Sequence, residues 1–175
     1  MLSDLGILLI RMLLGIAMSV HGAQKLLGWF GGYGLNGTAS FLEELGFRPG
    51  VGFAASIGLS ELAGGVLLMF GLFTPFGAAA VLVSMLLAIA SIQFKNRFLI
   101  IAPELELPFI YAVSAVGIAF TGGGAFSLDA MFGYEFSGRP LVVEGALILA
   151  LIATAAAARL RRRSKIVTSD DSYPI

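Results

Sequence analysis

The sequence contains no cysteine and only one histidine, His21. Without cysteine the chain cannot form a disulfide, a thiolate zinc site, an iron–sulfur ligation or a dithiol electron relay. One histidine alone supplies neither a metal centre nor the two axial ligands of a bis-histidine haem. The glycine-rich stretch GWFGGYGLNG follows no strand, so it is not a nucleotide fingerprint. The chain thus shows no haem, flavin, iron–sulfur or metal motif, and any electrons must travel on a molecule that it binds.

Charged residues are also scarce, at 13% of the 175 residues, whereas soluble domains carry about a quarter. Hydrophobic residues make up 58%, and the mean hydropathy is +0.93. This composition leaves too little polar surface for a water-facing globule and predicts an integral membrane protein in a lipid bilayer. The formal net charge is zero, so the sequence suggests no nucleic-acid partner.

Five apolar segments approach the ~20 residues that cross a hydrocarbon core of ~30 Å. They comprise residues 5–27, 52–72, 75–94, 105–124 and 141–159, of which the fourth is the weakest because Gly122 to Gly124 end it early. A spanning segment must satisfy its backbone internally, and these segments lack strand-like alternation, so they predict an all-α helix bundle. Asp4 and Arg11 disrupt the pattern of a signal peptide, and the first segment is therefore expected to remain as a helix.

Two connections have recognisable turn signals. Phe73-Thr74-Pro75 is a tight turn that makes the second and third segments an antiparallel hairpin. In the longer loop at residues 28–51, Ser40 and Glu43 fit a capping box and Gly46 fits a helix stop. We therefore expect a short helix in the membrane interface, beside an aromatic belt of Trp29, Phe30 and Tyr33.

Positive charge is distributed unevenly about the five predicted helices. All lysines and arginines except Arg11 and Arg139 fall on one side, including the run Arg159, Arg161, Arg162, Arg163 and Lys165. Because basic residues favour the cytoplasmic side, this bias predicts an external N-terminus and a cytoplasmic C-terminus. Residues 161–175 are then a basic and finally polar cytoplasmic tail.

The stretch RMLLGIAMSVHGAQK places Arg11, His21 and Lys25 near one face of the first helix. Glu61 lies mid-way along the second helix, where an unpaired carboxylate costs at least several kcal/mol. We therefore expect Glu61 to face the bundle interior and to form a network with Arg11 or His21. Gly64 and Gly65 would let a neighbouring helix approach closely.

Each of these residues also has a structural interpretation. The position of Lys25 is typical of a lysine whose side chain extends to the membrane interface. Arg11 and Glu61 are compatible with a structural ion pair between two helices as well as with a ligand-facing site. Glu104 and Glu106 fit solvated residues at a helix N-terminus. Asp129 fits a turn or capping residue better than an acid catalyst.

Three stretches together resemble the DoxX family of small bacterial membrane proteins. They are IRMLLGIAMSVHGAQKLLGWFGG, GLSELAGGVLLMFGLFTPFGA and ELPFIYAVSAVGIAFTGGGAFSLDAMFG, which span about residues 5–133 in matching order. The resemblance implies a four-helix membrane bundle over residues 1–133, from which the helix at 134–160 departs as a fifth. The recurrent family positions it implies are Arg11, Gly22, Lys25, Glu61, Gly65, Gly71 and Ser127-Leu128-Asp129.

The family resemblance implies a role in oxidoreduction, since one member is linked to thiosulfate:quinone oxidoreduction and others to oxidative and thiol stress. We therefore expect a quinone-linked oxidoreductase subunit of the bacterial cytoplasmic membrane, with His21 and Glu61 as catalytic residues. Arg11, Lys25 and Glu61 are the expected ligand-binding residues. His21 can relay a proton near neutral pH, and a partner subunit must supply the electrons.

Two other functions remain open from the sequence. The chain could be a non-enzymatic membrane anchor that holds a soluble redox or detoxification enzyme through its cytoplasmic loops and tail. It could also be a small carrier for a proton or weak acid that uses Glu61, although five helices without an internal repeat would then have to act as a homo-oligomer.

Overall fold

The computed structural model describes residues 1–96, 103–134, 136 and 139–161 of the chain. In this part of the chain four helices are apolar and long enough to cross a membrane: α1 (Leu2–Leu27), α3 (Gly50–Phe70), α4 (Thr74–Asn96) and α7 (Pro140–Leu160). α5 (Pro103–Thr121) is apolar too, but its stretch Leu105–Thr121 is shorter than these four. The predicted all-α membrane helix bundle is confirmed, including the additional helix near the C-terminus.

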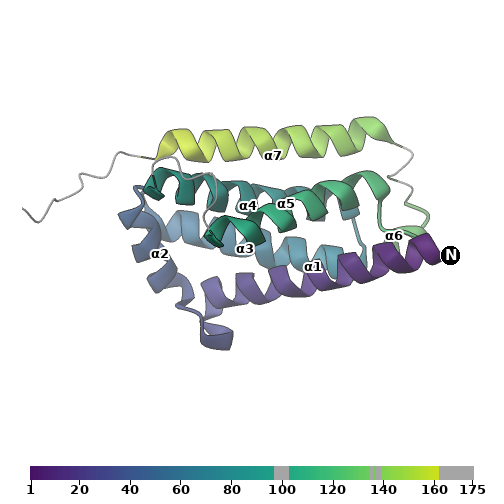
Figure 1. Ribbon diagram of the computed structural model, residues 1–175, viewed down its shortest axis with the longest axis horizontal. Helices are drawn as coiled ribbons and strands as arrows, with labels where there is room; N and C mark the ends of the chain where they lie inside the picture. The colour runs from purple at the N-terminus through teal and green to yellow at the C-terminus, as the bar shows by residue number, and fades with distance from the viewer. Residues whose placement is uncertain (97–102, 135, 137–138, 162–175) are drawn as a thin grey trace, which may run out of the picture.

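The long helices lie side by side along the longest axis of the molecule (Figure 1). α1 packs most extensively on α3, α3 contacts α4, and α4 contacts both α5 and α7. α7 therefore covers the α4 side of the bundle, away from α1 (Figure 1). A buried apolar core joins these helices and includes Leu14, Met18, Leu68, Val81 and Ala115.

The turn between α3 and α4 forms the predicted antiparallel hairpin. α3 ends at Phe70, and Gly71 follows with φ +63°, a left-handed conformation that glycine adopts without a steric penalty. α4 begins at Thr74. At the end of α5, Gly122 also has a positive φ, which explains why the fourth apolar segment is short.

The loop after α1 contains a 3-10 turn, η1 (Trp29–Gly31), and the helix α2 (Gly34–Glu44). The predicted capping box is wrong, because α2 begins at Gly34 without a side-chain cap and Ser40 lies inside the helix. Glu43 instead accepts a hydrogen bond from the backbone N–H of Gly50, at the start of α3 (2.9 Å). The expected stop at Gly46 is correct, since its φ is +93° and the helix ends two residues earlier.

At the opposite end of the bundle, α5 leads into the short helix α6 (Leu128–Met131) and then to α7. Ser127 is the N-cap of α6 and accepts a hydrogen bond from the N–H of Ala130 (3.1 Å). α6 lies beside the N-terminal end of α1 (Figure 1). Of the residues used for the orientation argument, Arg97, Arg162, Arg163 and Lys165 lie outside the described residues, as does the tail beyond Arg161.

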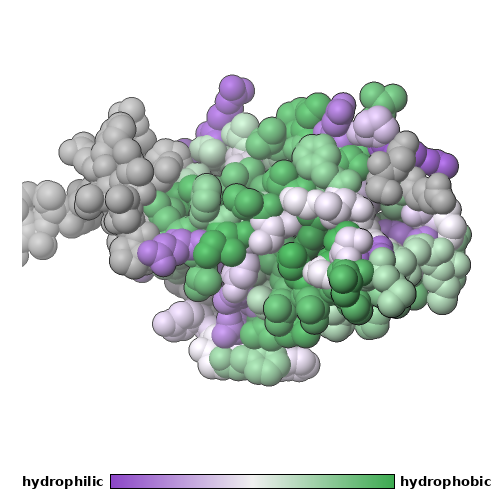
Figure 2. Space-filling model, turned by 45° about the vertical axis from the view of Figure 1, so that its right-hand side comes forward, coloured by the Kyte–Doolittle hydropathy of each residue, from purple (hydrophilic) through white to green (hydrophobic). Residues whose placement is uncertain are grey.

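Large apolar side chains cover much of the outer surface. Leu13 is 70% exposed, and Leu9, Val113 and Leu149 are more than half exposed. Figure 2 shows hydrophobic residues over most of one face, with hydrophilic residues in small scattered patches. A protein that exposes this much apolar surface would be unstable in water, whereas a lipid bilayer accommodates such a surface.

Candidate functional site

Two buried polar centres lie at different levels of the α1–α3 pair. The first, which we call the Lys25 centre, consists of Lys25 and Glu61. The second, which we call the Arg11 centre, consists of Arg11 and Asp129. Each joins residues far apart in the sequence, and each buries at least one charged side chain almost completely.

In the Lys25 centre, the Lys25 ammonium group bonds both carboxylate oxygens of Glu61. Glu61 is 1% exposed, whereas the side chain of Lys25 is 32% exposed. The pair therefore consists of a carboxylate inside the bundle and a cation that reaches its surface. A buried carboxylate without this partner would be strongly destabilising, by about 3–5 kcal/mol.

Close packing of α1 on α3 brings the two residues together. A Cβ at Gly22 would lie 2.5 Å from the backbone N of Leu62 and 2.7 Å from the carbonyl oxygen of Gly58. The helix backbones are therefore in contact around Gly22, one turn before Lys25. At this short separation, the side chains of Lys25 and Glu61 meet in the same interface.

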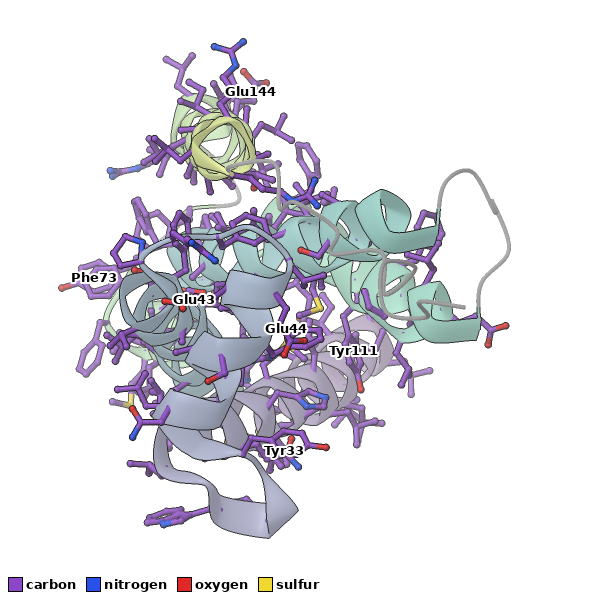
Figure 3. The ribbon with its side chains drawn as sticks, turned by 90° about the vertical axis from the view of Figure 1, so that its left-hand side faces the viewer. Tyr33, Glu43, Glu44, Phe73, Tyr111 and Glu144 are labelled. Carbon is purple, nitrogen blue, oxygen red and sulfur yellow. The ribbon has the colours of Figure 1, made fainter. Side chains whose placement is uncertain are left out.

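A cleft of about 600 Å³ opens beside the Lys25 centre, between the C-terminal end of α1 and the η1–α2 segment. His21 and Lys25 line it from α1, and Tyr33, Thr38 and Phe41 line it from the segment that follows. Glu61 is not part of its wall and lies behind Lys25. Figure 3, viewed from this end of the bundle, shows Tyr33, Glu44 and Tyr111 on the α1 side, and Glu144 far away on α7.

Hydrogen bonds fix the polar groups around this cleft. The Nδ1 of His21 lies 3.1 Å from Oε1 of Gln24, whose amide nitrogen donates to the carbonyl of Phe30 (3.2 Å). The hydroxyl of Thr38 donates to the carbonyl of Lys25 (3.3 Å), which ties α2 to α1. The His21 ring also lies against Tyr111 of α5, with 6.2 Å between the ring centroids. The imidazole is thus held in a defined orientation at the cleft wall.

In the Arg11 centre, the guanidinium binds backbone carbonyls. Nη1 of Arg11 donates to the carbonyls of Leu68 (2.7 Å) and Met69 (2.8 Å), and Nη2 donates to the carbonyl of Phe126 (2.8 Å). Leu68 and Met69 belong to the last turn of α3, where the helix dipole is negative; the Leu68 carbonyl also accepts a hydrogen bond from the N–H of Gly71 (3.1 Å). Arg11 is 1% exposed, so this buried cation caps a helix C-terminus.

Asp129 performs the complementary role at the start of α4. Its carboxylate accepts hydrogen bonds from the N–H of Phe73 (2.7 Å), the N–H of Thr74 (2.9 Å) and the Thr74 hydroxyl (2.6 Å). Its own N–H donates to the carbonyl of Gly71 (2.8 Å). A negative charge at a helix N-terminus is favourable, so the expected capping role of Asp129 is correct, although the helix that it caps is α4.

The expected contact between Arg11 and Glu61 is not formed. Arg11 bonds the end of α3, whereas Glu61 lies two turns earlier in that helix and pairs with Lys25. The side chain of Lys25 is partly exposed, as a lysine that extends to the interface would be, but it also pairs with buried Glu61. Sequence reasoning also missed Gln24 and Thr38 at the cleft, although the spacing of three residues between His21 and Gln24 places both on one helix face.

Comparison with known proteins gives a consistent family assignment. The DoxX family model matches residues 6–94, which include both α1 and α3. A Bacillus subtilis (strain 168) protein named "Putative oxidoreductase CatD" is 29% identical over 126 residues, 72% of this chain and 86% of that protein. An uncharacterized protein of Haemophilus influenzae is 34% identical over 107 residues, 56% of this chain and 80% of that protein. No solved structure matches the chain.

The family model covers just over half of the sequence, and both relatives are matched over most of their length. Within residues 6–94 lie Arg11, His21, Lys25 and Glu61. The apolar helices that contain these residues require a lipid bilayer around them. The chain is a multi-pass membrane protein of the DoxX family.

Proposed function

We propose that this protein is the membrane subunit of a quinone-linked oxidoreductase in the bacterial cytoplasmic membrane, and that the quinone ring binds in the cleft beside the Lys25 centre. The observation that carries this proposal is the position of Lys25. Its ammonium group is held by buried Glu61 and lines the cleft next to His21. This arrangement offers a fixed positive charge and a proton-carrying ring to one ligand.

The size and lining of the cleft suit an aromatic ring that carries carbonyl groups. A volume of about 600 Å³ falls in the usual range for small-molecule sites, about 300–1,000 Å³. Tyr33 and Phe41 supply aromatic surface, while Lys25 and His21 supply hydrogen-bond donors for quinone oxygens. The similarity to a relative named as an oxidoreductase favours this class of ligand.

Reduction of a quinone to a quinol takes up two electrons and two protons. We assign the electrons to a partner subunit, since this chain has no cysteine to carry them. Lys25 stabilises the negative charge that develops on a quinone oxygen, and Glu61 acts through Lys25 by fixing its position. His21 delivers the two protons to the reduced ring one after the other, and it regains a proton from water at the cleft mouth after each transfer.

Quinone binding can be measured with the single tryptophan of the chain, Trp29, which lies in η1 next to the cleft residues Gly31 and Tyr33. We expect a short-chain ubiquinone analogue to quench Trp29 fluorescence of the purified protein in a saturable way. Lys25→Met and His21→Phe should each weaken binding about tenfold, or ~1.4 kcal/mol. Arg48→Met is the matched control, because Arg48 is exposed and is not a lining residue of the cleft.

Equal binding by wild type, Lys25→Met and His21→Phe would overturn the proposed site. Absence of any saturable quinone binding, together with a soluble enzyme that co-purifies in mild detergent, would support the membrane-anchor function instead. Loss of quinone binding in Lys25→Met and His21→Phe, with normal binding in Arg48→Met, would support the oxidoreductase subunit.

A further inference from the structure

Gln24 connects the histidine of the cleft to the loop that follows α1. Its side-chain oxygen, Oε1, lies 3.1 Å from Nδ1 of His21, three residues earlier in α1. Its amide nitrogen, Nε2, donates to the backbone carbonyl of Phe30 in η1 (3.2 Å). Gln24 also lines the cleft. Both ends of its amide therefore have a partner, and the partner at one end is the group to which we assign proton transfer.

The Phe30 carbonyl determines which way the Gln24 amide faces. A carbonyl oxygen only accepts hydrogen bonds, so the amide atom that meets it is the nitrogen. The amide oxygen then faces His21, and because this oxygen also only accepts, Nδ1 must carry a proton to bond it. The hydrogen bond at one ring nitrogen thus selects the tautomer of neutral His21 with its proton on Nδ1. Imidazole side chains free in water prefer the other tautomer, with the proton on Nε2.

The loop that carries the Phe30 carbonyl is packed closely against Gln24. Gly32 directly follows η1, and a Cβ there would collide with the backbone oxygen of Gln24 and lie 2.5 Å from its Cα. The φ of Gly32 is −78°, which any residue adopts, so this glycine serves the close approach and not the turn. Phe30 has a φ of +53°, a left-handed conformation that persists only where surrounding contacts hold it. The contacts with Gln24 supply part of that hold.

Nε2 of His21 is the ring nitrogen that remains for a ligand. It makes no hydrogen bond with any residue that the structure describes. Within the described part of the chain, the buried side-chain nitrogen and oxygen atoms without a partner are Nε of Arg11 and Oγ of Ser19. Nε2 of His21 is therefore not buried, and the cleft is the space that His21 lines. Lys25 contributes its ammonium group to the same cleft.

The tautomer determines which redox form of the ligand matches the cleft. Neutral His21 presents an acceptor at Nε2, beside the donor of Lys25. Quinone oxygens only accept hydrogen bonds, whereas quinol hydroxyl groups also donate. A neutral Nε2 therefore bonds a quinol hydroxyl and repels a quinone oxygen. The imidazolium form, with a proton on each nitrogen, can donate from Nε2 to a quinone.

We propose that Gln24 is a positioning residue that fixes the Nδ1–H tautomer of His21 and thereby makes the cleft prefer the quinol to the quinone when His21 is neutral. Each proton that His21 delivers leaves from Nε2, while Nδ1 keeps its proton in the bond to Gln24. The electrons still come from the partner subunit. The choice of ligand rests on the proposed function, but the tautomer is a property of the protein without a ligand.

The tautomer can be measured by nuclear magnetic resonance. Because the chain has one histidine, labelling histidine with the heavy nitrogen isotope gives signals of His21 alone. At an alkaline pH, where imidazole is neutral, wild type should show a protonated Nδ1 and an unprotonated Nε2, which resonate far apart. Gln24→Leu should move the proton to Nε2. Gln24→Glu keeps an acceptor for the Nδ1–H and should retain the wild-type tautomer.

Two further variants separate the hold of the loop from general damage to the cleft. Gly32→Ala leaves the Gln24 side chain intact but displaces the loop from it, so it should give a mixture of both tautomers. Thr38→Val is the control, because it removes a different hydrogen bond to α1, that to the Lys25 carbonyl. It should retain the wild-type tautomer.

The preference for one redox form is measured by anaerobic calorimetric titration with a short-chain ubiquinone analogue and its quinol at the same alkaline pH. Wild type should bind the quinol more tightly than the quinone. Gln24→Leu should lower the ratio of the two affinities about fivefold, roughly the effect of one hydrogen bond. A merely structural role of Gln24 would weaken both forms equally, and an unchanged ratio would therefore overturn the proposal.

Three other results would also decide against it. A proton on Nε2 in wild type would overturn the tautomer even if Gln24→Leu fails to fold, and the same tautomer in wild type and Gln24→Leu would overturn the role of Gln24. Saturable quinone binding that leaves the Nε2 signal unchanged would overturn Nε2 as the ligand-facing nitrogen, while the proposed function stands. The expected tautomer in a protein that binds neither form would refute the proposed function and the preference, and would leave the positioning of His21 by Gln24 confirmed.

Discussion

At the level of single residues, the two buried cations of α1 are stabilised in different ways. Lys25 is paired with a full negative charge, the carboxylate of Glu61. Among the described residues, Arg11 donates its hydrogen bonds to backbone carbonyls, and buried Asp129 carries the opposite charge in the same centre. The planar guanidinium can serve several carbonyls at once, whereas the compact ammonium group of lysine matches one carboxylate. Lysine and arginine are therefore not interchangeable at these two positions.

A double-mutant cycle tests the Lys25–Glu61 pair. Lys25→Met should lower the free energy of unfolding by about 3–5 kcal/mol, because it leaves Glu61 buried without a partner. Adding Glu61→Gln should recover part of this loss, since it removes the charge that lacks compensation. The measurement is the reversible unfolding of the purified protein in mixed detergent micelles, monitored by circular dichroism.

The control for this cycle is the pair Arg11→Lys and Glu61→Gln. These residues belong to separate centres, so their effects on the free energy of unfolding should add within about 0.5 kcal/mol. Additive effects of Lys25→Met and Glu61→Gln would mean that the ion pair does not form in the membrane protein. Strong coupling between Arg11 and Glu61 would support the contact that the sequence suggested and the structure lacks.

At the level of helices, the α1–α3 contact depends on glycines that face the partner backbone. A Cβ at Gly15 would lie 2.6 Å from the backbone N of Met69, and one at Gly65 would lie 2.6 Å from the backbone N of Ser19. Real Cβ atoms essentially never make contacts this short, and these obstructing atoms belong to the backbone, which cannot rotate away. Small residues at such positions allow membrane helices to pack closely.

Gly22→Ala is expected to separate α1 from α3. The new methyl group would meet Leu62 N at 2.5 Å, so we expect overpacking to lower the free energy of unfolding by about 1–3 kcal/mol. Gly117→Ala in α5 is the same substitution in open space, with no atom within 4 Å of the new Cβ. It should be neutral or should stabilise the helix by up to about 1 kcal/mol.

Thermal unfolding in one detergent, with both variants side by side, measures this difference. Gly22→Ala should also weaken quinone binding in the assay above, because it displaces Lys25 relative to Glu61. Equal stability of Gly22→Ala and Gly117→Ala would contradict the close backbone packing of α1 on α3.

At the level of the whole molecule, the two described ends of the chain lie at opposite ends of the bundle (Figure 1). The N-terminus of α1 lies beside α6, whereas the end of α7 lies near α2, where Arg161 donates a hydrogen bond to the carbonyl of Leu45. An odd number of apolar helices running side by side produces this arrangement. It is compatible with the external N-terminus and cytoplasmic C-terminus that we propose from the distribution of basic residues.

The absence of native cysteine allows a direct test of this topology. In intact cells, a membrane-impermeant maleimide should label Ser3→Cys at the start of α1. Arg48→Cys, in the exposed connection between α2 and α3, should react only after the membrane is permeabilised. Labelling of Arg48→Cys alone would reverse the orientation, and labelling of both residues in intact cells would contradict the path of α1 across the membrane.

The sequence by itself determined the membrane class, the five apolar helices and the α3–α4 hairpin, because hydrophobic length and turn residues are local properties of the chain. It also identified Arg11, His21, Lys25 and Glu61 as unusual, since polar groups in apolar helices are costly wherever they lie. The start of α2 could not be predicted, because packing of Ala39 and Leu42 in a buried cluster outweighs the local cap signal at Ser40.

Only the tertiary structure decided which charges meet. The relative register of α1 and α3 is set by the close contact of Gly15 and Gly22 with the opposing backbone, and sequence spacing within one helix carries no information about it. That register pairs Glu61 with Lys25 and places Arg11 at the end of α3. The basic residues that the sequence places near one face of α1 therefore belong to two separate polar centres.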